Sequence, residues 1–363
     1  MNHSTTIIFA YRNRDVVRVN LALQSLQTQT NKNFQVLLID YGSDIEYASK
    51  LIAVVKAFDF ANYVYVGHTG LLWNKSKALN YGIRNATTDY IITADIDVLF
   101  TPNFIEKAHQ LANLNQFSLF KIGYLSKQIS EQQHRLLNLK HIKTTHVGDT
   151  FGIGLYPKIV LEKVRGLDEF FHFYGSEDED LNMRVQLTGA NLFRCEEVML
   201  YHQWHPRYPQ KKDNKLTIQP RLTNILRINQ RHFLQNKNNS ISHPNTNSWG
   251  NCYKKEDAKR LEDPNEVIKL SNIAANVVHF LQEELPKQCK GVIEVLFVED
   301  TYYNSVKYKI KQLLGKQTQP YFSMKEINDL VLKSILFRYR DYNYSYAISK
   351  DFKQIRFIID LSA

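Results

Sequence analysis

The sequence predicts an α/β fold in which a mostly parallel sheet is flanked by helices, followed by a small α+β module. In the first hundred residues, short apolar runs typical of buried strands alternate with segments whose apolar residues recur at helical spacing. The composition of the chain then changes after an Asn/Ser-rich stretch, "NKNNSISHPNTNS" (236–248). We therefore expect a main domain at residues 1–235, a linker at 236–254 and a C-terminal module at 255–363.

The first elements of the main domain are marked by apolar runs that end in polar turns. "TTIIFAYRNR" is typical of a first strand, and a helix is expected within residues 15–29. "FQVLLIDYGSD" predicts a second strand that ends at Asp40, before the turn residues Gly42 and Ser43. A helix near residues 45–58 and a strand at "NYVYVG" follow.

The next strand carries two carboxylates. After an expected helix at "NKSKALNYGIRNA", the stretch "TDYIITADIDVLFTP" (88–102) is typical of a buried strand, yet it contains two aspartates. Thr101 and Pro102 fit the N-cap and the first position of a helix that runs to about Leu114.

Further elements are expected later in the chain. A helix is predicted from Glu179 to Leu187. In the C-terminal module, we expect a helix that opens near Asp263 and runs to about Leu281, and another that opens with a capping box formed by Ser323 and Glu326. "GVIEVLFVED" and "FKQIRFIIDL" predict strands.

The net charge of +10 is concentrated in one segment. Between residues 207 and 237, eight lysines and arginines stand against one acid, Asp213. These basic residues are Arg207, Lys211, Lys212, Lys215, Arg221, Arg227, Arg231 and Lys237. The segment is either a solvated basic surface or a binding site for donor phosphates, a lipid-diphosphate or the inner membrane face. We expect no nucleic acid partner, because there is no zinc finger, aromatic RNA-binding signature or continuous basic helix.

Cysteine spacing and hydropathy bear on the compartment. Cys195, Cys252 and Cys289 are far apart and form no CxxC pair, so we expect neither a disulfide framework nor a thiolate zinc site. No apolar run approaches the roughly 18 residues that a membrane span needs. We therefore expect a cytoplasmic protein, and peripheral contact with the inner face of the membrane is a further possibility.

Polar residues are expected to converge at one edge of the sheet. Arg12, Asp40, Asp95 and Asp97 all follow predicted strands, and ligands of parallel sheets bind beyond the carboxyl ends of the strands. The pair Asp95 and Asp97 is able to bind a hard divalent cation. The alternatives are a turn whose aspartates cap the next helix, and a phosphatase of the haloacid dehalogenase type. The second alternative is disfavoured because Leu99 stands where that motif has Thr or Val.

Two later segments are candidates for chemistry. "YGSEDEDLNMR" (174–184) contains four consecutive acids flanked by aromatic residues, which favours partial burial and a general base over a solvated helix start. "VMLYHQWHP" (198–206) carries Met199, His202 and His205 at three-residue spacing, and histidine is a common ligand of first-row metals. A structural role is the alternative for these histidines.

Taken in order, these motifs resemble the GT-A glycosyltransferases, most closely family-2-type enzymes and the β-1,4-galactosyltransferase and N-acetylgalactosaminyltransferase-like group. "FAYRNR", "DYGS", "WNKSKALNYG", Asp-Ile-Asp, "YGSEDED" and "MLYH" are similar to six motifs of that group, over about residues 5 to 235. This chain departs from the group at Tyr41, where family-2 enzymes have Asp, and at Tyr174, where the galactosyltransferase-like group has Trp.

The resemblance implies a GT-A (Rossmann-like) fold and specific roles. Arg12 and Asp40 would contact the nucleotide, Lys77 the diphosphate, and Asp95 the ribose and metal side. Three residues would bind Mn²⁺, or Mg²⁺ in its place. Asp178 would be the catalytic base, with Glu177 close by. The implied metal ligands are Asp97, His202 and Met199.

The implied function is an inverting, metal-dependent transfer of a sugar from a UDP-sugar to a saccharide hydroxyl. Galactose or N-acetylgalactosamine is the expected sugar, and the acceptor is an oligosaccharide or a lipid-linked saccharide. The composition, rich in Asn, Lys and Ile, and the absence of an anchor suggest bacterial surface polysaccharide synthesis. The alternative is a protein that keeps the fold and binds a nucleotide sugar or a carbohydrate without turnover.

Overall fold

The chain forms two compact units in a computed structural model that describes residues 3–132, 139, 142–206 and 210–362. Unit 1 consists of Met1–Val66, Trp73–Arg207 and Leu226–Cys252. Unit 2 consists of Gly67–Leu72, Tyr208–Ile225 and Tyr253–Ala363. Both units are therefore built from segments that are far apart in the sequence.

Within the described residues, unit 1 is built on an eight-stranded sheet with the order β3-β2-β1-β4-β7-β6-β8-β5. Its strands are β1 (Thr5–Tyr11), β2 (Phe34–Tyr41), β3 (Ala61–Val66), β4 (Tyr90–Ala94), β5 (Val98–Phe100), β6 (Gln116–Tyr124), β7 (His146–Pro157) and β8 (Asn191–His202). The pairings make β1, β2, β3, β4, β6 and β8 parallel to one another, while β5 and β7 run the opposite way. The expected α/β class with a mostly parallel sheet is confirmed.

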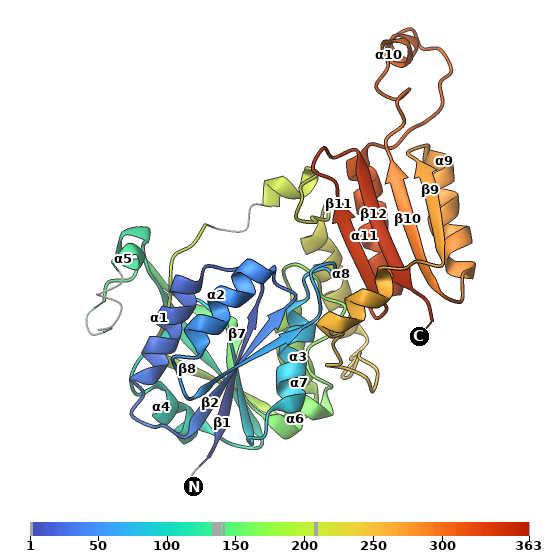
Figure 1. The fold of residues 1–363 in the computed structure, drawn as a ribbon. Coiled ribbons are helices and arrows are strands. Elements are labelled where there is room, and N and C mark those ends of the chain that lie inside the picture. The colour runs from blue at the N-terminus through green and yellow to red at the C-terminus, as the bar shows by residue number, and fades with distance from the viewer. Residues whose placement is uncertain (1–2, 133–138, 140–141, 207–209, 363) are drawn as a thin grey trace. The chain divides into compact units, whose positions relative to one another are not determined.

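Helices cover both faces of this sheet (Figure 1). The helices of unit 1 in the described residues are α1 (Val16–Gln27), α2 (Ile45–Val55), α3 (Lys75–Asn85), α4 (Phe104–Leu111), α5 (Lys127–Glu131), α6 (Lys158–Lys163), α7 (Glu177–Leu187) and α8 (Ile225–Asn238). Alternate residues of β1, such as Ile7 and Phe9, join one core cluster with residues of α1, α2 and α4. The intervening Ile8 lies against Gly82 of α3, where a Cβ atom would come within 2.5 Å of Ile8 Cγ2. The parallel strands are thus buried on both faces, which explains their nearly continuous apolar sequences.

The stretch 88–102 is two strands rather than one. β4 ends at Ala94, and after a turn the chain forms β5, which pairs antiparallel with the end of β8 so that Val98 lies opposite His202. The backbone N–H of Thr101 still donates to the carbonyl of Met199, so the helix that follows begins only at Phe104, with Asn103 as its N-cap. The expected cap at Thr101 is therefore wrong, because that residue continues the strand pairing.

Unit 2 contains a four-stranded sheet with the order β11-β12-β10-β9 in the part of the chain that is described. Its elements are β9 (Glu266–Ser271), α9 (Ala274–His279), β10 (Val292–Val298), α10 (Val306–Leu313), α11 (Met324–Ser334), β11 (Asn343–Ile348) and β12 (Gln354–Asp360), with short helical turns at Gln210–Asn214 and Lys255–Leu261. The capping box of Ser323 and Glu326 is present at the start of α11. The helix expected from Asp263 to Leu281 is wrong in its first half, because Glu266–Ser271 pairs as a strand with β10.

The segment 67–72 belongs to unit 2 because its backbone and side chains bond to β11. The His68 ring donates to Asn343 Oδ1 at 3.0 Å, and the hydroxyl of Tyr344 accepts from the N–H of Leu72 at 3.2 Å. The N–H of Tyr346 donates to the carbonyl of Gly70.

The Asn/Ser-rich stretch also packs against folded structure. Up to Cys252 it is part of unit 1, whereas we expected a linker at 236–254. The Asn245 side chain donates to the carbonyls of Arg165 and Leu167, at 2.8 and 2.6 Å. The division of the chain thus differs from the expected boundaries at 235 and 254. Among the described residues, no helix combines the length and the apolar character needed to cross a membrane.

Candidate active site

Three separate segments of unit 1 meet around the ammonium group of Lys75, in the first turn of α3. Lys75 Nζ lies 3.4 Å from Asp95 Oδ1, 3.4 Å from Glu177 Oε1 and 3.2 Å from Asp178 Oδ2. Asp95 follows β4, and the two other acids begin α7. One lysine therefore joins the acid pair after β4 to the acid cluster of residues 177–180. Sequence reasoning did not select Lys75.

A tight turn presents the acids at the start of α7. Phe173, Gly175 and Ser176 have φ values of +62°, +103° and +70°, a left-handed conformation that is unfavourable for residues with side chains. The N–H of Gly175 donates to Glu177 Oε2 at 3.0 Å, which fixes that carboxylate. Backbone strain of this kind often marks functional sites, and here it directs the first helical turn toward Lys75.

Residues from two other segments hold α7 in place. Asp180 and Arg184 are both fully buried and form an ion pair at 2.6 Å within the helix. Asn236 of α8 donates to both Asp180 and Asp168, at 2.9 Å each, and the His232 ring lies 2.8 Å from Asp168. Asp180, the fourth acid of the cluster, therefore has a structural role, because it satisfies buried donors.

Gly152 of β7 leaves room for the carboxylate of Asp178. A Cβ atom at this position would lie 2.3 Å from Asp178 Oδ2. The neighbouring Phe151 accepts at its carbonyl a hydrogen bond from Asn182, one turn further along α7. Strand β7 thus determines where the side chain of Asp178 lies.

Burial and charge set the protonation of this cluster. Burial raises the pKa of Asp178 to about 7; Glu177 and Asp95 add to the rise, and Lys75 opposes it. Burial disfavours the charge on Lys75, but the surrounding carboxylates outweigh it and raise the pKa of the ammonium group. Desolvation also raises the pKa of Asp95, but the charges of Lys75 and His202 outweigh it and hold the pKa of that carboxyl below its usual value. A carboxylate with a pKa near neutrality is suited to accept a proton.

A second group of side chains is able to hold a metal ion. Ligand atoms of Asp97, His202 and His205 all lie within 4.8 Å of one another. His202 Nε2 is 3.6 Å from Asp97 Oδ1, and His205 Nε2 is 3.3 Å from Asp97 Oδ2. One carboxylate and two imidazoles form a donor set that fits a divalent first-row ion better than Mg²⁺, which prefers oxygen ligands.

Met199 does not join this group. It is 1% exposed and packs in the main core cluster. Met199 and His202 are three positions apart in β8, and side chains at odd spacing in a strand point to opposite faces. Met199 therefore packs in the core, and His205 is the residue that stands with Asp97 and His202; the ligand role expected for Met199 stays a prediction.

The residues expected to contact the nucleotide lie at the ends of β1 and β2. Asp40 is fully buried, and its oxygens accept hydrogen bonds from the N–H of Ser43 at 3.0 Å and the hydroxyl of Tyr63 at 2.9 Å. Burial raises the pKa of Asp40, while these donors and the charge of Arg12 lower it. Asp40 thus fixes the turn after β2, and Arg12 is the partly exposed member of the two.

Lys77 lies in a different environment from Lys75. Lys77 is 7% exposed, and its Nζ is 4.0 Å from Glu169 Oε2. The other oxygen of this carboxylate, Oε1, accepts hydrogen bonds from the Asn80 side chain and the N–H of Gly250. Positions two apart on a helix point about 200° away from each other. Lys75, not Lys77, is therefore the cation of the acidic cluster.

The basic segment 207–237 is divided between the units, and Arg207 lies outside the described residues. Arg221 pairs with Asp213 at 3.1 Å, which accounts for one of the seven other charges. Of the remaining basic residues, unit 2 contains Lys211, Lys212 and Lys215, and unit 1 contains Arg227, Arg231 and Lys237.

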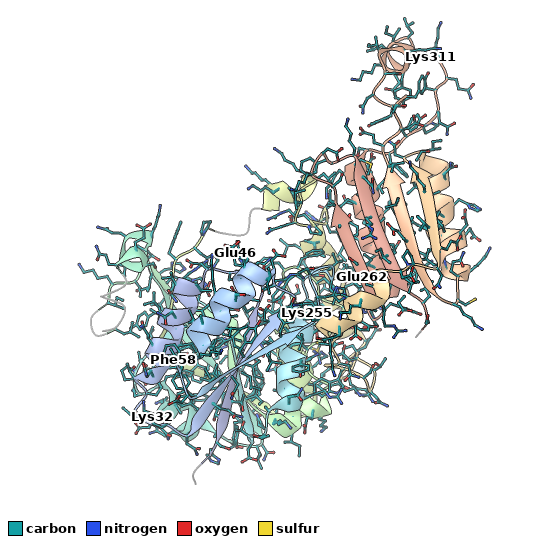
Figure 2. All side chains as sticks on the ribbon, viewed as in Figure 1. Lys32, Glu46, Phe58, Lys255, Glu262 and Lys311 are labelled. Atoms are coloured by element: carbon teal, nitrogen blue, oxygen red, sulfur yellow. The ribbon has the colours of Figure 1, made fainter. Side chains whose placement is uncertain are left out.

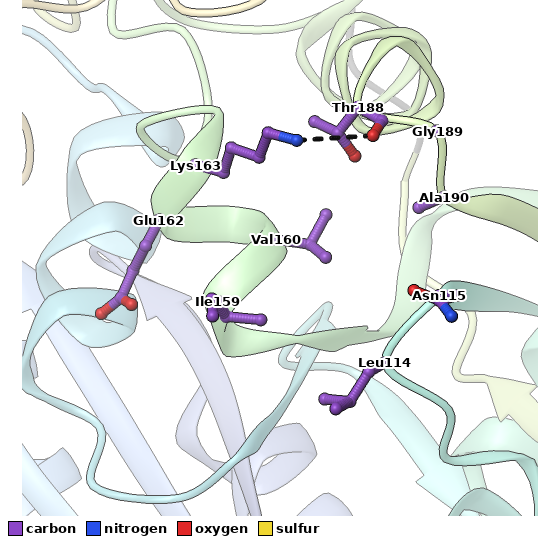
Figure 3. A pocket seen from close by; sticks show the side chains of 9 residues that line it. All are labelled: Leu114, Asn115, Ile159, Val160, Glu162, Lys163, Thr188, Gly189 and Ala190. Atoms are coloured by element: carbon purple, nitrogen blue, oxygen red, sulfur yellow. Dashed lines mark hydrogen bonds between the residues drawn. The ribbon is translucent and has the colours of Figure 1, made fainter.

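A hollow of about 500 Å³ lies at the opposite end of the sheet (Figure 3). Its lining includes Asn115 and Ala190, which precede β6 and β8, whereas His202 ends β8. The Lys163 ammonium donates to the carbonyl of Thr188 there. This hollow does not share residues with the acidic cluster or the metal-binding group.

Two protein-family models match the part of the chain that carries these groups. Residues 5–155 match the model described as glycosyl transferase family 2. Residues 133–205 match the N-terminal domain of galactosyltransferase. Together the matches span β1 to β8 and include the residues around Lys75 and the metal-binding group.

Individual relatives share limited sequence identity with this chain. The chain is 30% identical over 146 residues to an uncharacterized glycosyltransferase of Rickettsia felis, covering 39% of this chain and 22% of that protein. It thus spans about a fifth of the Rickettsia relatives that it matches. The O-antigen biosynthesis glycosyltransferase WbnJ of Escherichia coli is 24% identical over 204 residues, or 53% of this chain and 77% of that protein.

Solved structures include GalNAc-T7 with UDP, GalNAc and Mn²⁺ (TM-score 0.44, 12% identity, 56% of this chain and 44% of that chain). Another is the mannosyltransferase PcManGT from Pyrobaculum calidifontis with GDP-Man and Mn²⁺ (TM-score 0.42, 15% identity, 58% of this chain and 60% of that chain). The matches of the two family models and the mixed sheet agree with the resemblance in the motifs. Residues 5–155 of this chain are therefore similar to glycosyl transferase family 2 and residues 133–205 to galactosyltransferases, and both stretches lie in the eight-stranded mixed sheet of unit 1.

Proposed function

We propose that the protein is an inverting, metal-dependent glycosyltransferase that moves a hexose from a UDP-sugar to a saccharide hydroxyl. The observation that carries the proposal is the position of Asp178, a carboxylate with raised pKa, beside Lys75 and Asp95, while Asp95 also interacts electrostatically with His202 and His205 of the metal-binding group. Galactose and N-acetylgalactosamine are our first candidates for the sugar. An oligosaccharide or lipid-linked acceptor in bacterial surface polysaccharide synthesis agrees with the O-antigen relative.

Asp178 is the base in the proposed reaction. Its carboxylate accepts the proton of the acceptor hydroxyl as that oxygen bonds to the anomeric carbon. The bond from the anomeric carbon to the diphosphate oxygen breaks in the same step, and UDP leaves with the electron pair. Because the entering oxygen and the leaving group lie on opposite sides, the configuration at the anomeric carbon inverts.

Lys75 and Glu177 keep Asp178 in position for this task. Lys75 contacts all three carboxylates, so it prevents their mutual repulsion from moving Asp178 away. Arg12 is assigned to the nucleotide phosphates or ribose, supported by Asp40. Asp95 is assigned to the nucleotide side of the metal.

Asp97, His202 and His205 would hold the metal, for which Mn²⁺ is the first candidate and Mg²⁺ the second. When bound, a divalent cation neutralises the charge that develops on a leaving diphosphate. Arg18 stands 4.0 Å from Asp97 Oδ2 and helps to orient that carboxylate.

The test is UDP release from a panel of UDP-sugars with Mn²⁺, with and without EDTA. We expect turnover that EDTA abolishes and that falls at least a hundredfold in Asp97→Ala and Asp178→Asn. Met199→Leu is the matched control for metal binding, since Met199 is a core residue, and it should retain turnover. Equal turnover in wild type, Asp97→Ala and Asp178→Asn would exclude this site.

A second readout is independent of turnover. Mn²⁺ should raise the melting temperature of the wild-type protein and of Met199→Leu, but not that of Asp97→Ala or His205→Ala. If His205→Ala keeps the full shift and His202→Ala loses it, His205 is not a ligand.

The alternative is a protein that binds a nucleotide sugar or a carbohydrate without turnover. It predicts saturable binding of a UDP-sugar by calorimetry and no UDP release with any acceptor. The presence of a base-like carboxylate at Asp178 favours the enzyme.

A further inference from the structure

A short helical arm extends from unit 2 at the end of strand β10. The arm comprises residues 301–320, and α10 lies at its tip, beyond the carboxyl end of β10 (Figure 1). Figure 2 shows Lys311 at this tip, among side chains that point outward. The arm takes no part in the site described above.

One side of α10 is fastened by tyrosines. Tyr308 is 3% exposed, and its ring contacts those of Tyr302, Tyr303 and Tyr321 at centroid distances of 5.3 to 5.9 Å. Ser305 caps the helix by accepting from the N–H of Tyr308. The orientation of α10 in the arm is therefore fixed, and its opposite side faces outward.

That outward side is apolar. Val306, Ile310, Leu313 and Leu314 are 71%, 49%, 86% and 64% exposed. Their spacing of four, seven and eight residues from the first places them on one stripe of the helix. Leaving four large apolar side chains together in water is unfavourable, and such a patch marks an interaction surface.

Lysines border this stripe on both sides. At 100° per residue, Lys309 falls on one side of it, and Lys307 and Lys311 on the other; Lys316 follows the helix. The sequence has no Asp or Glu from residue 301 to 325. The nearest acids are engaged at the base of the arm, where Asp300 accepts from Tyr321 and Glu326 caps α11.

We propose that α10 binds the surface of a bilayer that contains anionic lipid, with Val306, Ile310, Leu313 and Leu314 in the headgroup region. A narrow apolar stripe between lysines on a convex helix matches the interfacial amphipathic helices. The lysine stems reach the headgroups while their ammonium groups stay hydrated. The positive charge along the whole arm selects an anionic surface over a neutral one. This inference is independent of the proposed transferase activity.

The test is cosedimentation of the full chain with vesicles of phosphatidylcholine alone or with phosphatidylglycerol added. We expect binding only to the anionic vesicles, weakened at least tenfold by high salt. Leu313→Ser with Leu314→Ser, and separately Lys307→Gln with Lys309→Gln, should each weaken binding at least tenfold without changing the melting temperature. Ile45→Ser is the matched control, because Ile45 is also 71% exposed but begins α2 of unit 1, outside the arm.

Two results would overturn the proposal. One is equal binding of wild type and both α10 variants to anionic vesicles, which would move the contact to another surface such as segment 207–237. The other is self-association in the absence of vesicles that the leucine variant removes, which would make a second copy of the chain the partner of this stripe. UDP release measured on the same samples keeps this outcome separate from that of the proposed function.

Discussion

Lys75 and Lys77 form different ion pairs, although they are only two positions apart in one helix. Lys75 contacts three carboxylates at the site, whereas Lys77 is buried near Glu169. The motif resemblance selected Lys77 for contact with the diphosphate, and that role stays a prediction, because a motif match does not say which face of the helix a residue lies on. A rotation of 200° between the two positions was the available signal that only one of them faces the sheet edge.

Replacing Lys75 should therefore change the chemistry of the site. In Lys75→Met, the loss of the nearby positive charge raises the pKa of Asp178 further, so the pH profile of kcat/KM moves toward alkaline pH by about one unit or more. Lys77→Met is the control: it should lower the melting temperature and leave the pH profile in place. An unchanged profile in Lys75→Met would mean that the lysine does not act on Asp178.

Asp178 itself predicts how activity depends on pH. Because its pKa is raised to about 7, the carboxyl is protonated below that pH and cannot accept a proton, so kcat/KM should rise through pH 7 to a plateau. The exposed neighbour Glu179 provides the matched control Glu179→Gln, which should keep this profile. A profile that is flat from pH 5 to pH 8 would contradict the assignment.

The same shift makes a prediction for stability. A carboxyl whose pKa is raised on folding stabilises the folded state below its ordinary pKa of 3.8, and this contribution is lost as the pH rises toward 7. Asp178→Asn should therefore raise the melting temperature relative to wild type at pH 8, and the gain should shrink toward pH 4. A lower melting temperature at pH 8 would show that Asp178 stabilises the fold as a carboxylate.

Strand β7 acts on the site through a glycine. In Gly152→Ala, the new Cβ would collide with Asp178 Oδ2 at 2.3 Å, so we expect a loss of kcat of at least tenfold with a smaller change in donor KM. Gly148→Ala in the same strand is the control, because its Cβ would meet Tyr124 only at 3.4 Å. Equal activity of the two variants would show that Asp178 is free to move.

Elements were predictable where local pattern and tertiary pairing agree. The strands β1, β2 and β4 and the helices α1 and α11 follow their apolar periodicity and caps. Residues 266–271 instead form β9, because pairing with β10, some 25 residues away, outweighs a helical spacing that was also present. Met199 and His205 illustrate the same limit within the site, since the course of the chain at the end of β8 decides which side chains stand beside Asp97.

At the level of the whole molecule, the two units are interleaved in sequence. Segments 67–72 and 208–225 complete unit 2 although both lie within the span of unit 1. No local sequence pattern predicts this interleaving, because it depends on hydrogen bonds between residues about 275 positions apart, such as His68 with Asn343. The expected arrangement of two consecutive domains missed it for this reason.

The interleaving predicts that the chain cannot be shortened to residues 1–252, which contain all of unit 1. Leu71, Leu72 and Leu222, which are 4%, 2% and 0% exposed, would lose their partners and become exposed. We expect a chain of residues 1–252 to aggregate or to unfold at a lower temperature than the full chain, as measured by size-exclusion chromatography and circular dichroism. A monomer with cooperative unfolding at the wild-type temperature would contradict this.

The position of residues 67–72 also has a consequence for synthesis of the protein. These residues leave the ribosome early, but Tyr344 and Tyr346, to which they bond, follow some 270 residues later. At about 5–20 residues per second, Leu71 and Leu72 wait roughly 14 to 55 s for their partners. During that interval the nascent chain displays the leucine pair Leu71 and Leu72 between two parts of a unit that is itself still folding. Chaperones that bind short apolar segments on growing chains are therefore expected to engage this protein at residues 67–72.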